Sequence, residues 1–305
     1  MSFSKDTKAE LAGAQTEQQW QLHALVYGLV LFSKRFSPEE ITLTTESHSA
    51  ATVYSNSLSQ LAAAIVDVRC TLSRRGSDGA LYTLRVPDKN DCERIYDSFG
   101  HSKNEVSLRI NRANIGDDDA AAFFLRGVFL SCGSVSSPDK DYHLEFSVAH
   151  RNLASDLARL IDEIEVLNAH PGIAVRKGSY VVYIKGSDSI ADVLAFIGAP
   201  MASLEIVQQR IYRSLRNKVN RKINSETANS NKTAAAAAKQ IRAIERIEKK
   251  RGLSSLPDEL RELARLRLDN PEYNLRELGE ALSTPISRSG VNHRLQRLIE
   301  ISEEL

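Results

Sequence analysis

Hydrophobic residues recur at helical spacing in two short runs near the end of the chain. Asn274 stands where an N-cap would begin the first helix, Ser283-Thr284-Pro285 would end it, and a second helix would begin near Ser287. The apolar positions are Leu275, Leu278 and Leu282 in the first run and Val291, Leu295 and Leu298 in the second. Spacings of three and four place each set on one helical face, so the segment predicts two amphipathic helices joined by a tight turn.

The outward face of the second helix carries side chains that hydrogen-bond well to nucleic acids. The residues expected to contact DNA bases are Ser287, Arg288, Ser289, Asn292 and His293. Arginine pairs with guanine and asparagine with adenine, and a helix-turn-helix lays its second helix in the major groove. Phosphate contacts are expected from basic residues on and before this motif, namely Arg276, Arg294, Arg297, Arg216, Lys218, Arg221, Lys222 and Lys232.

Two amphipathic helices joined by a turn also occur in helical domains that bind no DNA, and spacing alone leaves both interpretations open. Charge favours DNA, because the outward face of the second helix carries no acid before Glu300, whereas a solvated face usually mixes signs. The net charge is −6 over residues 1–205 and +7 over residues 206–305, and residues 210–251 hold 13 basic and 3 acidic side chains. A basic stretch can be a merely solvated helix, but this one precedes the motif directly, which favours contact with phosphates.

Residues 8–205 repeat one order of elements, with starts about 100 residues apart. The first half, about 8–112, predicts helices at 20–36, 50–65 and 91–99 and strands at 41–46, 66–72, 80–86 and 106–110. The second half, about 117–205, predicts helices at 120–132, 151–167 and 189–197 and strands at 142–148, 173–177 and 179–185. The pattern indicates an α+β domain built from two similar halves.

The remaining segments complete a two-domain organisation. A basic helix is expected over 201–224 and would close an N-terminal domain of residues 1–224. Residues 225–232 are polar and poor in large apolar side chains, and are expected to form a linker. Residues 233–305 predict an all-α domain that ends in the helix-turn-helix and begins with an alanine-rich helix closed by Gly252.

The apolar helices that open the two halves share a glycine between apolar residues. One reads Val-Tyr-Gly-Leu-Val-Leu-Phe-Ser-Lys over residues 26–34, and the other reads Leu-Arg-Gly-Val-Phe-Leu-Ser-Cys-Gly-Ser-Val over residues 125–135. The second resembles the LAGLIDADG motif of homing endonucleases. The resemblance implies that two such helices pack closely at the centre of a pseudo-dimer, and that the last acidic residue of each motif holds a divalent metal.

Those acidic positions correspond here to Ser33 and Cys132, and neither is the hard carboxylate oxygen that magnesium selects. We therefore expect a degenerate scaffold without a metal and without enzymatic activity. A second interpretation is that Gly28 and Gly127 are helix-packing glycines in an unrelated fold, which the repeated order of elements argues against. Two alternative functions are a divergent nuclease and a scaffold that binds other proteins through residues 1–205, which carry a net negative charge.

The order of motifs along the chain resembles the WhiA family of bacterial regulators. The likeness rests on the degenerate LAGLIDADG-like domain followed by the segments 220–229, 232–233, 253–260 and 285–295. It implies a cytoplasmic, nucleoid-associated regulator that binds promoter DNA and acts in cell division, chromosome segregation and sporulation-type development. It also implies a WhiB-type iron–sulfur partner and RNA polymerase as partners, and no cofactor.

Composition and motif searches exclude several other classes. No apolar run approaches the roughly 18 residues of a membrane span, the polar start of the chain is not expected to be a signal peptide, and no Walker loop or GxGxxG occurs. Cys70, Cys92 and Cys132 are scattered and support neither a disulfide framework nor a zinc site.

His143 and Glu145 share one face of a strand and are expected to be a surface pair rather than an acid/base couple. The Arg74–Gly79 segment is expected to be a plain turn, with phosphate contact as the alternative.

Overall fold

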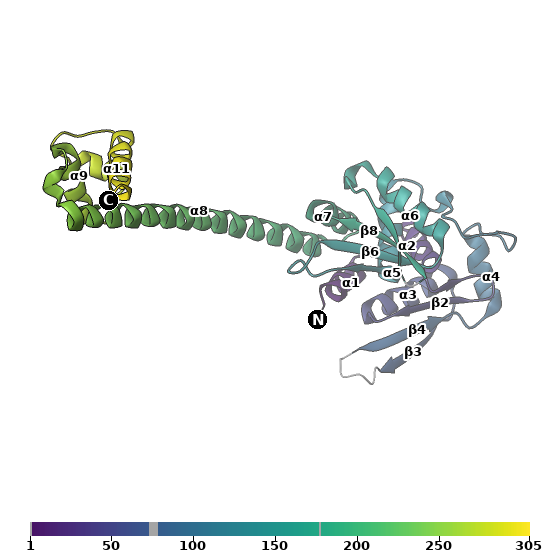
Figure 1. Cartoon of the computed structure of the whole chain (residues 1–305). Coiled ribbons are helices and arrows are strands. Elements are labelled where there is room, and N and C mark those ends of the chain that lie inside the picture. Colours follow the sequence, from purple (N-terminus) through teal and green to yellow (C-terminus); the bar gives the residue numbers. More distant parts are fainter. Residues whose placement is uncertain (1, 73–78, 177) are drawn as a thin grey trace. The chain divides into compact units, whose positions relative to one another are not determined.

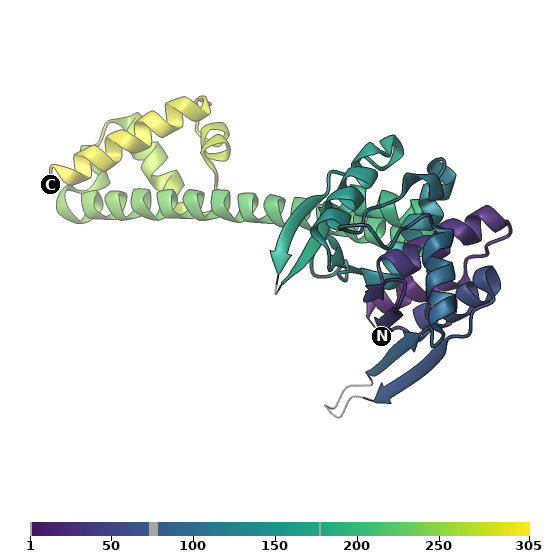
Figure 2. The same cartoon turned by 90° about the vertical axis from the view of Figure 1, so that its right-hand side faces the viewer.

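The computed structural model describes residues 2–72, 79–176 and 178–305. The chain forms two compact units, Met1–Arg213 and Ser214–Leu305. Of the predicted turn at residues 74–79, only Gly79 lies within the described residues. Figures 1 and 2 show the described elements from two directions.

Unit 1 is built from one sequence of elements used twice, which confirms the predicted duplication. After α1 (Phe3–Gly13), the first copy comprises α2 (Gln19–Leu31), β1 (Arg35–Phe36), β2 (Ile41–Thr45), α3 (His48–Ala62), β3 (Asp67–Leu72), β4 (Ala80–Arg85) and α4 (Lys89–Ser98). The second comprises α5 (Asp118–Cys132), β5 (Gly133–Val135), β6 (His143–Val148), α6 (Arg151–Glu163), β7 (Gly172–Arg176), β8 (Ser179–Lys185) and α7 (Ser187–Phe196). The two antiparallel sheets have equivalent strand orders, β1-β2-β4-β3 and β5-β6-β8-β7.

Two local predictions in unit 1 need correction, and one helix was missed. The helix expected over residues 20–36 ends at Leu31, because Arg35 and Phe36 pair with β2 as a separate short strand. The strand expected at 106–110 is not formed, because this segment is held by a carboxylate instead of a neighbouring strand. Asp156 of α6 accepts hydrogen bonds from the Arg109 side chain at 2.7 Å and from the Ile110 backbone at 3.1 Å. Helix α1 was not predicted at all.

The centre of unit 1 is the crossing of α2 and α5, where two glycines bring the backbones into contact. A Cβ built on Gly127 would overlap the carbonyl oxygen of Leu25 and lie 2.9 Å from the amide nitrogen of Leu29. A Cβ built on Gly28 would overlap the carbonyl oxygen of Phe124 and lie 3.0 Å from the amide nitrogen of Val128. Only glycine allows this approach, because backbone atoms cannot move aside as the tip of a side chain can.

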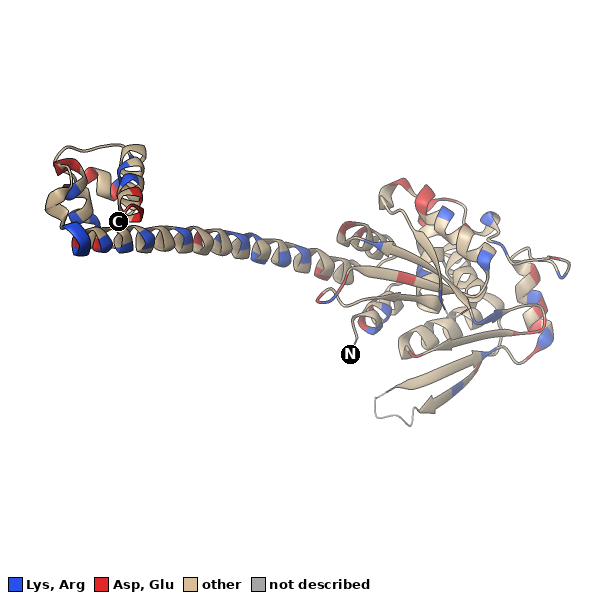
Figure 3. Ribbon diagram, viewed as in Figure 1, with Lys and Arg blue, Asp and Glu red and all other residues tan. Residues whose placement is uncertain are grey.

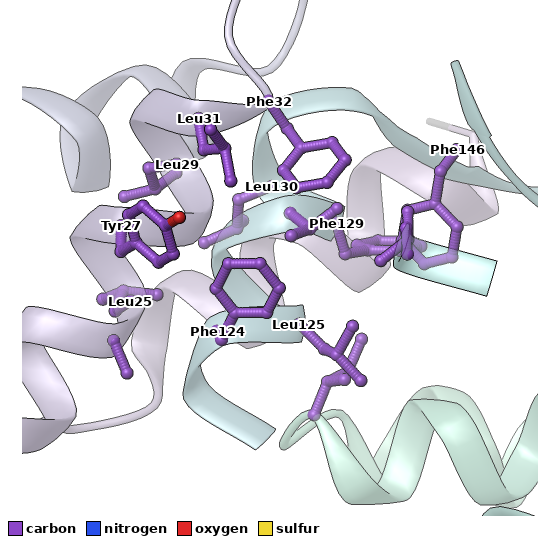
Figure 4. Close-up of a cluster of buried hydrophobic side chains, with 14 of the residues drawn as sticks. Leu25, Tyr27, Leu29, Leu31, Phe32, Phe124, Leu125, Phe129, Leu130 and Phe146 are labelled. Carbon is purple, nitrogen blue, oxygen red and sulfur yellow. The ribbon is translucent and has the colours of Figure 1, made fainter. Parts of the chain in front are cut away.

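Large side chains close around this crossing (Figure 4). The rings of Tyr27 and Phe124 lie 5.5 Å apart, and the rings of Phe129 and Phe146 lie 6.2 Å apart in an edge-to-face arrangement. All four side chains are fully buried. Helix α2 is apolar on nearly every side from Leu22 onward, as expected for a helix that is covered all round. The two halves of unit 1 therefore share a single hydrophobic core.

Helix α8 (Pro200–Arg251) begins in unit 1 and ends in unit 2. Residues 225–232 are helical, so the predicted break between a basic helix and an alanine-rich helix is wrong. The polar residues of this segment have modest helix propensity, but it contains no proline or glycine, and adding a residue to an existing helix is easier than starting a new one. Gly252, at φ +76°, ends the helix as predicted, and its amide donates to the carbonyl oxygen of Glu248 at 3.0 Å.

Unit 2 is all-α, with a small core of its own. The end of α8 packs with α9 (Asp258–Asp269), α10 (Leu275–Glu280) and α11 (Arg288–Glu303) (Figures 1 and 2). The core includes Ile244 and Ile247 from α8 and Leu263 from α9. All six apolar positions predicted for the two short runs are buried or packed against this core, namely Leu275, Leu278, Leu282, Val291, Leu295 and Leu298.

Substitution of Gly127 by alanine is expected to destabilise unit 1, because the new methyl group must push two helix backbones apart. Overpacking of this kind costs about 1–3 kcal/mol, more than the roughly 1 kcal/mol of helix propensity that alanine gains over glycine. The measurement is the free energy of unfolding in urea. The control is Gly13→Ala at the end of α1, where a Cβ would meet no atom within 4 Å. Equal stability of the two variants would contradict the close crossing.

Candidate nucleic-acid interface

The turn between α10 and α11 is fixed by a close backbone approach. Gly279 accepts a hydrogen bond from the Ile286 amide at 3.1 Å, and a Cβ on Gly279 would overlap the Ile286 carbonyl oxygen. The start of α10 is equally defined, because the Asn274 side chain accepts from the Glu277 amide at 3.1 Å while the Glu277 carboxylate accepts from the Asn274 amide at 2.7 Å. This reciprocal capping satisfies amide groups that have no partner within the helix. Asn274 was predicted as the cap, whereas the role of Gly279 was missed.

Helix α11 begins as predicted at its N-cap, Ser287, whose hydroxyl accepts from the Gly290 amide at 3.2 Å. The residues predicted to contact bases are all exposed, namely Ser287, Arg288, Ser289, Asn292 and His293. They occupy the N-terminal half of the helix, opposite the buried Val291 and Leu295. The described structure thus presents these polar side chains to solvent from one helix. Contact with bases stays a prediction.

Three arginines predicted to contact phosphate are already paired with carboxylates. Arg276 pairs with Glu280 at 2.8 Å, Arg297 pairs with Glu300 at 3.0 Å, and both arginine side chains are more than half exposed. Such exposed pairs contribute little and leave an arginine free to exchange partners.

Arg294 differs from these two arginines. Its guanidinium lies 2.6 Å from the Glu259 carboxylate of α9, and its side chain is only 24% exposed. A contact with phosphate would require this arginine to leave an ion pair that joins two helices. Its observed role is to tie α11 to α9.

The basic residues predicted on α8 form an exposed series (Figure 3). Its members are Arg216, Lys218, Arg221, Lys222 and Lys232. Lys222 lies 3.9 Å from Glu226, which is the single acid between residues 214 and 244. This part of the helix therefore carries a strong excess of positive charge, as binding to a polyanion requires.

The positions that correspond to the acids of the LAGLIDADG motif hold groups unsuited to a divalent metal. The Ser33 hydroxyl donates to the backbone carbonyls of Val30 at 2.7 Å and Arg35 at 2.8 Å. Burial raises the pKa of the Cys132 thiol to about 12, so the sulfur is neutral at physiological pH. The Lys8 ammonium of α1 donates to the Leu130 carbonyl at 3.1 Å, and burial lowers its pKa to about 8. A hydroxyl, a neutral thiol and an ammonium group do not form the oxygen-rich, anionic set that magnesium requires.

Other predicted side chains take up structural positions. His143 and Glu145 lie 3.1 Å apart, and Arg176 pairs with the same carboxylate at 3.1 Å, so they form a partly exposed ionic cluster. Cys70, Cys92 and Cys132 are free thiols. Within residues 2–72, 79–176 and 178–305, no group of three or more His, Cys, Asp and Glu side chains could hold a metal. Among the described helices, none is both long enough and apolar enough to cross a membrane.

Family models match both units. Residues 121–216 match the WhiA LAGLIDADG-like domain, and residues 219–302 match the WhiA C-terminal HTH domain. These matches confirm the predicted fold class, an α+β LAGLIDADG-like domain followed by an all-α helix-turn-helix domain.

Relatives match over the full length of the chain. A protein from Thermoanaerobacter sp. (strain X514), named as a probable cell division protein WhiA, is 37% identical, and the match covers 100% of this chain and 98% of the relative. A protein of the same name from Clostridium acetobutylicum is 35% identical with the same coverage. The crystal structure of full-length DUF199/WhiA from Thermatoga maritima superimposes with a TM-score of 0.60 at 26% identity, covering 100% of this chain and 99% of that one. The chain therefore belongs to the WhiA family.

Proposed function

We propose that this protein is a regulator that binds specific sequences of double-stranded DNA through α11 and controls transcription of genes for cell division. The printed names of its relatives support the link to cell division. Chromosome segregation, sporulation-type development and association with the nucleoid belong to the same proposal and rest on the family resemblance. A WhiB-type iron–sulfur regulator and RNA polymerase are proposed partners on the same ground.

The observation that carries the proposal is the exposed polar half of α11. Arg288 and Asn292 are the side-chain types that read guanine and adenine in the major groove, and both are exposed. No acid lies on α11 before Glu300, so a phosphate backbone can approach its start without repulsion from this helix. The exposed basic series on α8 would supply contacts that are independent of sequence.

Loss of base reading is expected when Arg288 or Asn292 is replaced by alanine. Each change is expected to cost about 1–3 kcal/mol of binding free energy at a cognate site. Cognate sites would first be located by chromatin immunoprecipitation and sequencing, and dissociation constants would then be measured on cognate and scrambled duplexes. Arg265→Ala on α9 is the control, because it removes the same charge from an exposed position outside α11. Equal losses on both duplexes would show that Arg288 and Asn292 do not read bases.

Substitution of Lys218 or Arg221 by alanine is expected to act on all DNA sequences alike. The fall of log affinity with log salt concentration should become less steep, by about 1 in slope for each lost phosphate contact. The control is Lys239→Ala, which removes a lysine of the same helix that lies 3.9 Å from Glu303. An unchanged salt slope in both variants, with binding intact, would remove these residues from the interface.

The proposal includes the absence of nuclease activity, because Ser33 and Cys132 lack the carboxylates that a catalytic metal needs. The purified protein is expected to leave supercoiled plasmid intact with either Mg²⁺ or Mn²⁺. Conversion to nicked or linear plasmid that disappears on substitution of Ser33 or Cys132 would instead favour a divergent nuclease.

Binding of other proteins by unit 1 is compatible with DNA binding by unit 2, and a pull-down with residues 1–205 would test it.

A further inference from the structure

A cavity of about 470 Å³ opens in unit 1 beside the crossing of α2 and α5. Its apolar walls are leucines of α1, α2 and α5, and one face of α3 forms its polar wall. This volume lies within the range of pockets that bind small molecules. The DNA-binding surface proposed above does not include it, since all of its lining residues belong to residues 11–130.

Arg126 of α5 lines this cavity and carries a charge without a counter-ion. The residue is 7% exposed, and its Nε donates to the Ile197 carbonyl at 2.7 Å. Its Nη1 atom is buried and has no hydrogen-bond partner within the described residues. Among the described residues, no carboxylate forms an ion pair with Arg126, and burial lowers the pKa of its guanidinium. A buried charge is normally paired, because removing it from water is costly.

The polar wall of the cavity offers further groups that favour an anion. His48 and Ser49 stand at the N-terminal end of α3, where the helix dipole is positive and backbone amides lack helical partners. Thr52, Asn56 and Gln60 follow on the same face. The Thr52 hydroxyl already donates to the His48 carbonyl at 3.0 Å, whereas the side-chain amides of Asn56 and Gln60 can donate to a ligand. No aspartate or glutamate is among the lining residues that the structure describes. The guanidinium, the start of a 15-residue helix and these neutral donors together form an electropositive site.

We propose that this cavity binds a small organic anion, with its carboxylate or phosphate group toward Arg126 and α3 and a short apolar part against the leucines. The anion would balance the buried guanidinium and accept from the amide donors of Asn56, Gln60 and the start of α3. Because Arg126 lies on a central helix of unit 1, an occupant would add contacts between α3 of the first half and α5 of the second.

The protein contains a built-in reporter of this site. Trp20 is its single tryptophan, and the rings of Trp20 and Phe123 lie 5.6 Å apart. The Arg126 guanidinium lies 4.5 Å from the centre of the same Phe123 ring. An anion that shifts the guanidinium is therefore expected to change the emission of Trp20. The full-length protein would be titrated with inorganic phosphate, acetate and hexanoate at constant ionic strength, and the melting temperature measured in parallel.

Two exposed positions on α3 supply matched variants. Asn56→Glu places a negative charge in the cavity wall, whereas Ser59→Glu places the same charge on the same helix outside the cavity lining. A saturable response to phosphate or to a carboxylate is expected in the wild type and in Ser59→Glu, with affinity at least about ten-fold weaker in Asn56→Glu. Arg126→Gln should abolish the response if that variant folds. The probe that saturates at the lowest concentration identifies the anionic group.

Two results would overturn the proposal. The first is the absence of a saturable response of the wild type to all three anions. The second is an equal response in Asn56→Glu and Ser59→Glu, which would show that the anions act on the protein surface in general.

Discussion

The backbone contact between α2 and α5 is the constraint on which unit 1 depends. Gly28 and Gly127 stand opposite each other, and a methyl group on either would overlap a carbonyl oxygen of the other helix. The contact brings the two halves into one core, because each half has a sheet whose apolar face needs a cover. The same contact orients α5 so that Phe129 meets Phe146 of the second sheet. A close crossing of two helices thus organises both sheets.

The glycines and the motif acids serve separate purposes, and only the glycines remain here. Packing of α2 on α5 needs no metal, because shape and apolar contact hold the crossing. At the ends of these helices, Ser33 bonds to backbone carbonyls and Lys8 bonds to the Leu130 carbonyl. A carbonyl at the C-terminal end of a helix attracts cations, so the Leu130 carbonyl partly offsets the cost of burying the Lys8 ammonium. The fold can therefore form without carboxylates at these two positions.

Sequence reasoning succeeded where one regular pattern decided the structure. The spacing of Leu278, Leu282, Val291 and Leu295 predicted the helix-turn-helix, since each residue enters one small core. Prediction failed where the local structure depends on contacts with residues far along the chain or on very short elements. Strands β1 and β5 have two and three residues, too few for a pattern to emerge, and the segment at 106–110 is held by Asp156, which lies far along the sequence. The break expected at 225–232 was inferred from side-chain polarity, which sets helix propensity only weakly. The ion pair of Arg294 with Glu259 and the close approach at Gly279 depend on how the helices pack, and neither leaves a pattern in the sequence.

The arrangement of ion pairs in unit 2 separates residues that are free to meet DNA from those that are engaged. Arg276 and Arg297 form exposed pairs that a phosphate can displace at little cost, whereas Arg294 is paired with Glu259 and mostly buried. Among the described residues, no carboxylate pairs with Arg288, while Ser289 and Asn292 are neutral. The start of α11 can therefore engage a base edge without first breaking an internal ion pair. Since breaking the Arg294 pair would subtract from binding free energy, the proposed base reading is expected at the start of α11 rather than at Arg294.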